Sequence, residues 1–186
     1  VNGNYLSECS SYGIRVSYNQ RDDYFIEVND NILENTVDGS TTGIIAMEST
    51  NYTPIDPDIE INRNQVRGFN SGIRAFSLTG PQIIDNEIEL SAYYFPTGIN
   101  VIVGRNATVK GNSVTGATLT ACDISTDPPD ISTGIRINNS ADTYVACNTV
   151  GQLQRGFEYR GFTGNITSTH FYQNYMGYCS YQFYLN

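Results

Sequence analysis

The feature that most constrains this chain is a short pattern that recurs along its whole length. It consists of an apolar residue, two spacers, an asparagine, one spacer and a second apolar residue. Its copies begin at Val1, Val28, Ile61, Ile83, Val109, Val145 and Phe171. A second pattern, glycine followed by a large apolar residue, alternates with the first, at Gly13, Gly43, Gly72, Gly98, Gly134 and Gly156. Self-similarity at a period of about 20–50 residues indicates a solenoid, in which short repeats stack along one axis.

Within each repeat the residues predict short β-strands. After each glycine, apolar residues alternate with others, as in Ile73 and Ala75 or Ile135 and Ile137. Period two is the strand signature, because alternate side chains point to opposite faces. Two further short strands flank the asparagine. The chain shows no apolar recurrence at i, i+3 and i+4, so helices are not expected. The sequence therefore predicts an all-β, right-handed parallel β-helix of about six coils, with three short strands per coil.

The repeated asparagines and glycines are predicted to have structural roles. Asparagine tolerates the left-handed conformation at a bend and can bond its own backbone and the next coil, so the asparagines should form an internal ladder. The glycines are expected at bends that need a positive φ. The residues before three successive asparagines are Asp30, Arg63 and Asp85. Their alternating charges are expected to stack across coils and to help fix the register.

The "GI … I..N.I" repeats resemble those of the right-handed parallel β-helix (pectate-lyase-like) superfamily. The resemblance covers nearly the whole chain. It implies the fold, but it implies no single activity, because pectate lyases, polygalacturonases, phage tailspikes and bacterial surface proteins share this architecture.

Charge and composition exclude several functions. The formal net charge is −9, and Lys110 is the only lysine. This balance argues against nucleic acid as a partner and against binding to anionic membrane surfaces. No run of 18 apolar residues exists, so no membrane insertion is expected. Few charges and many Asn, Gly, Ser, Thr and Tyr residues favour a secreted or cell-surface protein.

The chain opens and stops inside a repeat. We therefore expect residues 1–186 to be a single domain and a fragment of a longer polypeptide, with incomplete coils at both ends. Neither end shows a capping helix or a proline-blocked strand. Since an uncapped strand edge is adhesive, further coils or other subunits are expected to cover the ends.

Loops of unequal length indicate where a ligand would bind. Three long loops, 33–43, 88–98 and 114–134, leave the same corner of the predicted coil, and one of them carries Tyr93, Tyr94 and Phe95. Exposed aromatic residues on a loop stack on sugars or anchor protein partners. The alternative is that these three side chains fold back over the solenoid.

The strand after each glycine presents a second set of candidates. Its predicted outward positions include Arg15, Asn100 and Glu158 together with Arg74 and Arg136, and the last two are the candidate ligand-binding residues. A glycosidase needs paired carboxylates, whereas Glu158 is the single outward acid found here, so no catalytic residue is assigned. We expect a structural or adhesive segment whose loops contact glycan or protein at the cell surface. The alternative is a polysaccharide lyase or glycoside hydrolase whose catalytic coils lie partly outside this sequence.

Two weaker site predictions concern metal and disulfide chemistry. Asp23 and Asp56 occupy equivalent positions in neighbouring repeats, and their oxygen atoms could hold Ca²⁺, although a solvated acidic corner is the favoured interpretation. No other cofactor is expected. Cys122, in the longest loop, and Cys147, at the turn of the next coil, are predicted to form a disulfide, which would fit an oxidising compartment.

Overall fold

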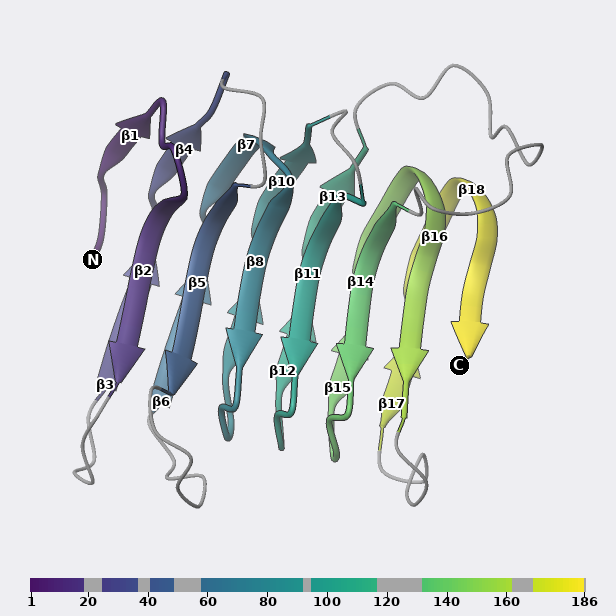
Figure 1. The fold of residues 1–186 in the computed structure, drawn as a ribbon. Coiled ribbons are helices and arrows are strands. Elements are labelled where there is room, and N and C mark those ends of the chain that lie inside the picture. The colour runs from purple at the N-terminus through teal and green to yellow at the C-terminus, as the bar shows by residue number, and fades with distance from the viewer. Residues whose placement is uncertain are drawn as a thin grey trace.

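The protein is an all-β solenoid of parallel strands. The computed structural model describes residues 1–18, 25–36, 41–48, 58–91, 95–116, 132–161 and 169–185, except for the side chains of 18, 48, 58, 178 and 180–182, and these ranges contain strands but no helix. The strands lie side by side from the N-terminus at one end of the stack to the C-terminus at the other (Figure 1).

The strands fall into three sets. The first comprises β1 (Tyr5–Ser7), β4 (Ile32–Glu34), β7 (Gln65–Phe69), β10 (Glu87–Leu90) and β13 (Ser113–Thr115). The second, which follows the repeated glycines, comprises β2 (Tyr12–Tyr18), β5 (Thr42–Glu48), β8 (Ser71–Phe76), β11 (Thr97–Ile102) and β14 (Thr133–Asn138). The third comprises β3 (Phe25–Asn29), β6 (Asp58–Asn62), β9 (Gln82–Ile84), β12 (Thr108–Lys110), β15 (Tyr144–Ala146) and β17 (His170–Tyr172).

Two long strands join the first two sets. β16 (Thr149–Arg160) pairs with β13 through its first residues and with β14 through its last, and β18 (Tyr175–Leu185) pairs with β16 along its length. The first and second sets therefore form one 12-stranded sheet, while the third set forms a separate six-stranded sheet. Successive strands within each set pair in parallel, as β2–β5 and β5–β8 do. The predicted parallel solenoid is confirmed at this level.

Like residues stack on like residues inside the solenoid. The residue after each repeated glycine is buried and stays in register from strand to strand, in the column Ile14, Ile44, Ile73, Ile99, Ile135 and Phe157. The apolar anchors of the asparagine pattern, such as Val28 and Val66, are also fully buried. Burying an aliphatic side chain of this size stabilises the fold by about 1.5–3 kcal/mol, so each repeat contributes its own share of the core.

The repeated glycines are required by close packing and not by a bend, which corrects the prediction. Gly72 does not have a positive φ. A Cβ atom placed on it would lie 2.6 Å from the carbonyl oxygen of Gly98 and 2.6 Å from Cγ2 of Ile88. The same overlap with the next glycine and with an apolar anchor recurs at Gly13, Gly43, Gly98 and Gly134. The absence of a side chain lets successive strands and the core approach each other.

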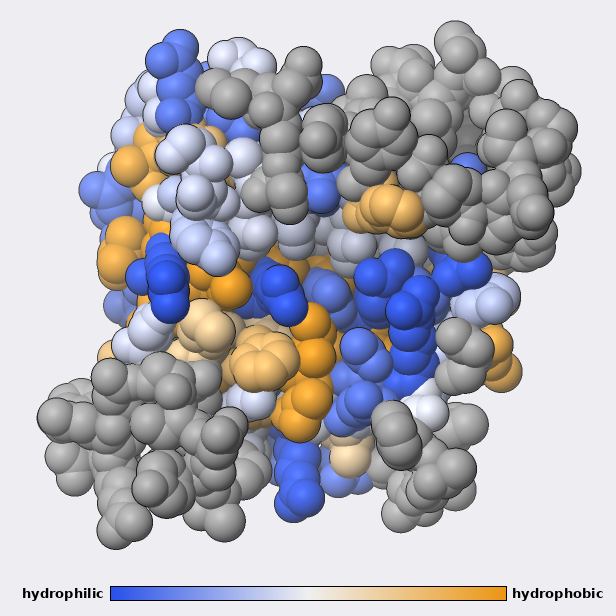
Figure 2. All heavy atoms as spheres, in the orientation of Figure 1, coloured by the Kyte–Doolittle hydropathy of each residue, from blue (hydrophilic) through white to orange (hydrophobic). Residues whose placement is uncertain are grey.

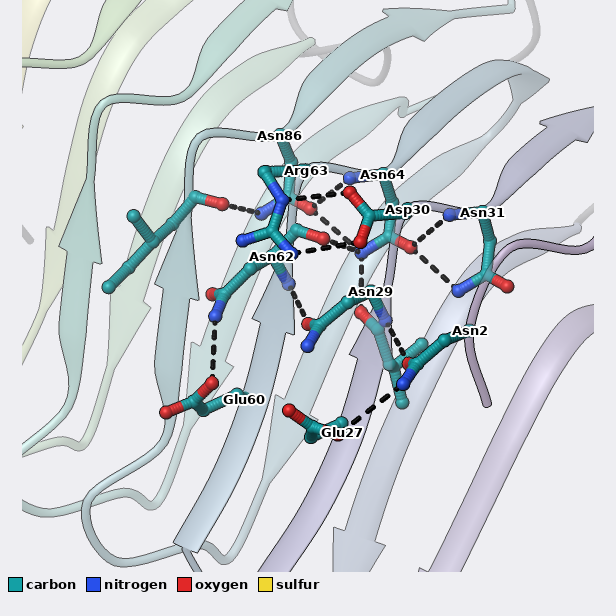
Figure 3. A network of polar contacts seen from close by, with 12 residues as sticks. Asn2, Glu27, Asn29, Asp30, Asn31, Glu60, Asn62, Arg63, Asn64 and Asn86 are labelled. Carbon is teal, nitrogen blue, oxygen red and sulfur yellow. Dashed lines mark hydrogen bonds and ion pairs between the residues drawn. The ribbon is translucent and has the colours of Figure 1, made fainter.

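The predicted asparagine ladder is present (Figure 3). Asn64 is fully buried, and its main-chain N–H and its Nδ2 both donate to Oδ1 of Asn86, at 2.9 and 3.0 Å. Its Nδ2 also donates to the carbonyl oxygen of Val28, 2.7 Å away in the preceding repeat. Donation of this kind to the next Oδ1 continues through Asn4, Asn31, Asn64, Asn86, Asn112, Asn148 and Asn174.

The left-handed conformation is adopted by the residue before each ladder asparagine. This corrects the prediction that the asparagine itself takes that conformation at the bend. These residues have φ between 49° and 69°, at Gly3, Asp30, Arg63, Asp85, Gly111, Cys147 and Gln173. The ladder asparagine itself satisfies the backbone groups that the bend leaves unpaired. The predicted stacking of charges is seen at Arg63, which donates to both carboxylate oxygens of Asp30, each at 2.8 Å, on the surface. The pKa of Arg63 is raised chiefly by Asp30, and the charge of Asp85 also raises it.

A second, shorter asparagine ladder was not predicted. Asn2, Asn29 and Asn62 lie two residues before ladder asparagines (Figure 3). Oδ1 of Asn2 accepts from the main-chain N–H of Asn29, and Oδ1 of Asn29 accepts from that of Asn62, each at 2.9 Å. The ladder ends at Asn62, whose Oδ1 is buried without a hydrogen-bond partner, because Ile84 occupies the next place in the register. The sequence did contain a signal for this second ladder, because each of its asparagines stands two residues before an asparagine of the first ladder.

Candidate functional site

The candidate site lies on the outer surface of the strands that follow the repeated glycines, called here the glycine face (β2, β5, β8, β11, β14 and the last half of β16). Side chains that alternate with the buried column form two outward rows across these strands. The first row is Arg15, Ile45, Arg74, Asn100, Arg136 and Glu158, and it continues beyond the face into Tyr184 of β18. The second is Ser17, Met47, Phe76, Ile102, Asn138 and Arg160.

The two halves of this face differ in chemistry. Figure 2 shows hydrophobic side chains gathered over β5, β8 and β11 and hydrophilic ones over β14 and β16. Met47, Phe76 and Ile102 are neighbours in the second row and are half-buried. Ile45, in the first row, is only 4% exposed. A ligand lying along the stacking direction would therefore meet apolar and polar surface at the same time.

A buried glutamate with three arginines occupies the polar half. Glu158 has no exposed surface, and its Oε2 accepts from Nε of Arg136 at 2.6 Å. Its Oε1 accepts from Nη1 of Arg155 and from Nε of Arg160, both at 2.6 Å. The Thr133 hydroxyl donates to Oε2 at 3.2 Å and accepts from Nη2 of Arg136 at 3.1 Å. Ionised partners make these short, charge-assisted hydrogen bonds.

The electrostatics keep this glutamate ionised. Burial by itself raises the pKa of the Glu158 carboxyl, but the hydrogen bonds and charges of Arg160 and Arg136 outweigh burial, so the pKa lies below its usual range. The pKa of Arg136 is lowered, chiefly because burial disfavours its charged form, although Glu158 opposes the change. A carboxylate held in this way does not release and take up a proton near neutral pH, so it is unsuited to general acid–base chemistry.

Arg155 is the most deeply set of the three arginines. Its guanidinium carbon lies 3.6 Å from the centre of the Tyr184 ring, a cation–π contact that ties β18 to β16. Its Nε is buried and has no hydrogen-bond partner. The same holds for Oδ1 of Asn100, two strands away in the first row. Two polar atoms on this face are therefore left unsatisfied by the protein itself.

The structure brings some of the predicted site residues together. Arg74 and Arg136 lie in the same row on either side of Asn100, with Arg74 exposed and the side chain of Arg136 17% exposed. Phe95 is 51% exposed just before β11. Tyr93 and Tyr94 lie outside the described residues.

The metal and disulfide predictions are left open. Asp23, Asp56 and Cys122 lie outside the described residues, so the Ca²⁺ site and the disulfide stay predictions. Cys147 is exposed, and its Sγ is 3.8 Å from Oε1 of Gln173. Within the described ranges, no three His, Cys, Asp or Glu side chains gather as a metal site.

Sequence reasoning missed part of this cluster. It placed Glu158 and Arg136 on the outward row, but it did not single out Arg155 or Thr133. Both stand directly before a repeated glycine, at Gly156 and Gly134, and the register pairs them across β14 and β16. That shared position was the signal that could have linked them.

Comparison of the chain with protein-family models, curated proteins and solved structures found no match. In the part of the chain that the structure describes, no helix is long and apolar enough to span a bilayer.

Proposed function

We propose that this chain is a structural or adhesive segment of a secreted or cell-surface protein, and that its glycine face and neighbouring loop bind glycan or protein. The observation that supports this most is the makeup of the face. It combines the exposed guanidinium of Arg74 with the half-buried Phe76 and Asn138 along one direction, while its single described carboxylate, Glu158, is held by three arginines. Such a surface favours binding over acid–base catalysis, which needs a second carboxylate with a different pKa.

The test is binding of the labelled chain to glycan and protein arrays. Replacing Tyr93, Tyr94 and Phe95 together by alanine is expected to reduce binding and to leave the melting temperature unchanged. Tyr144→Ala is the matched control, because Tyr144 is an exposed aromatic residue on the six-stranded sheet. Equal binding by the wild type and both variants would rule out the loop as an anchor. Absence of all binding would rule out the adhesive function.

We further infer that the solenoid is a single right-handed parallel β-helix of about six coils over residues 1–186, like those of the pectate-lyase-like superfamily. Two arguments support this. Strands of each set pair in parallel in chain order, and crossover connections between parallel strands are right-handed in roughly 98% of cases. An experimental structure that shows left-handed coils or a different number of coils would refute the inference.

We also propose that further coils or other subunits cover the ends of the stack. The outermost strands, β1, β2 and β3 at one end and β17 and β18 at the other, are sheet edges and carry exposed aromatic residues. Examples are Tyr5 and Phe25 at the first end and Tyr175 and Phe183 at the second. Unpaired strand edges readily add another strand. Light scattering of residues 1–186 alone should show self-association, and a stable monomer at high concentration would contradict the proposal.

A further inference from the structure

We propose that the glycine face binds an anionic linear glycan, with Arg74 and Arg136 contacting its negatively charged groups and Phe76 packing against its rings. This inference rests on the proposed function and narrows its ligand class. A chain of sugars laid along the stacking direction would cross β8, β11 and β14 in turn.

The local charge of the face favours an anionic ligand. Three guanidinium groups, those of Arg136, Arg155 and Arg160, surround the one carboxylate of Glu158, which leaves a positive surplus on this part of the face. In the outward rows that the structure describes, Glu158 is the only acid and Arg74 adds another positive charge. The chain as a whole carries −9. A positive patch on an acidic protein attracts an anionic ligand to that patch and repels it elsewhere.

Arg136 and Arg160 also keep hydrogen-bond donors that the bonds to Glu158 and Thr133 do not use. Arg136 bonds Glu158 through Nε and Thr133 through Nη2, so its Nη1 is left for a ligand. Arg160 uses only its Nε, and its side chain is 41% exposed. Burial already disfavours the charge of Arg136 and lowers its pKa. A bound anion would relieve this cost, because opposite charge favours the ionised guanidinium.

The spacing of the two arginines also fits a polymer. Asn100 separates Arg74 from Arg136 in the row. Neighbouring strands lie about 4.8 Å apart, which puts the two arginines on strands roughly 10 Å apart. A polymer whose anionic groups repeat at about this distance would contact both arginines at once. Its ring faces would lie on Phe76 and Ile102, the neighbours in the second row.

The experiment measures binding of the chain to three soluble polymers by titration calorimetry at low and high salt. Hyaluronan carries carboxylates, dextran sulfate carries sulfates, and dextran is neutral. We expect at least one anionic polymer to bind, binding to weaken with salt, and dextran not to bind. Arg74→Gln and Arg136→Gln should each weaken binding by roughly tenfold or more, since each removes a charge-assisted hydrogen bond.

Arg67→Gln is the matched control, because Arg67 lies on β7, on a different face, and its loss changes the net charge equally. Arg74 is exposed, and within the described residues it makes no hydrogen bond, so its substitution should not disturb folding. Circular dichroism of each variant checks this. Equal losses in Arg67→Gln and Arg74→Gln, or binding of dextran as tight as that of both anionic polymers, would overturn the inference.

Two outcomes separate this inference from the proposed function. In the first outcome, the aromatic loop variant loses binding to the arrays and Arg74→Gln does not. This result would keep the adhesive function and overturn the proposal of an anionic ligand. Arginine-dependent binding of poly-glutamate but of neither anionic glycan would also overturn it, in favour of an acidic peptide. A wild-type chain that binds nothing on the arrays and no polymer would defeat both.

Discussion

Removing one member of the asparagine ladder is expected to destabilise the solenoid strongly. In Asn86→Ala the side chain that accepts from the main-chain N–H and Nδ2 of Asn64 disappears, and both donors are buried. The carbonyl oxygen of Ile61 loses its donor from Asn86 Nδ2 at 2.8 Å, and Asn112 Oδ1 loses another at 2.9 Å. A buried polar group left unsatisfied costs about 1–3 kcal/mol, so the expected loss is about 3–6 kcal/mol.

Asn62→Ala provides the control for this prediction. Asn62 is also buried, and it lies in the shorter ladder, two residues before Asn64. Its Oδ1 already lacks a partner and its Nδ2 donates to Glu60 alone, at 3.2 Å. Because few bonds are lost, Asn62→Ala should cost about 1 kcal/mol or less. The difference between the two variants therefore measures the hydrogen bonds of the long ladder, because both variants lose a buried amide side chain.

Urea denaturation followed by far-ultraviolet circular dichroism measures both variants. We expect the midpoint of Asn86→Ala to fall well below that of Asn62→Ala, with similar m-values, because the surface exposed on unfolding is nearly unchanged. If the two variants differ in unfolding free energy by less than about 1 kcal/mol, the ladder does not hold the repeats together. A change in m-value would show instead that the repeats unfold separately.

Other perturbations test packing, charge and the predicted disulfide. Gly98→Ala should lower the unfolding free energy by about 1–3 kcal/mol, because the new Cβ would lie 2.6 Å from the carbonyl oxygen of Gly134. Glu158→Gln should cost about 3 kcal/mol or more at neutral pH, since it leaves buried arginines without their counter-charge. The lowered pKa of Glu158 means that its stabilisation is present above the unfolded-state pKa of about 4.3 and is lost as pH falls through the folded-state pKa. Melting curves of wild type and variant should therefore converge in acid, and a constant gap would contradict this. Peptide mapping without reductant should find Cys122 joined to Cys147; two free thiols would exclude the bond.

The periodic part of the fold could be predicted because every repeat repeats the same physical requirement. An anchor such as Val66 must be apolar to enter the core, and Asn64 must carry both a donor and an acceptor to bond the repeats on either side. The glycine before Ile73 must lack a side chain. Each requirement fixes the residue type at one position of every repeat. The parallel solenoid and the ladder can therefore be predicted from the repeating pattern alone.

The candidate site was only partly predictable. Alternation put Arg136 and Glu158 on the outer face, but it cannot say which long side chains converge. Whether an outward glutamate is solvated or buried among arginines depends on the neighbouring strands and on rotamers, which a one-dimensional pattern does not encode. The misassigned role of the glycines has the same origin, because it depends on the distances between strands.

The sequence by itself determined the class of fold, the stacking of the repeats along one axis, and the residues that line the interior. The reason is that burial and backbone hydrogen bonding impose the same demand on every repeat. Only the tertiary structure decided how Arg136, Arg155 and Arg160 share the carboxylate of Glu158 and which of their donors are left open. Arg155, Glu158 and Arg160 lie on β16 and Arg136 lies on β14, and this combination occurs once. Their meeting therefore depends on side-chain conformation and on the register between the two strands, and not on any recurring pattern.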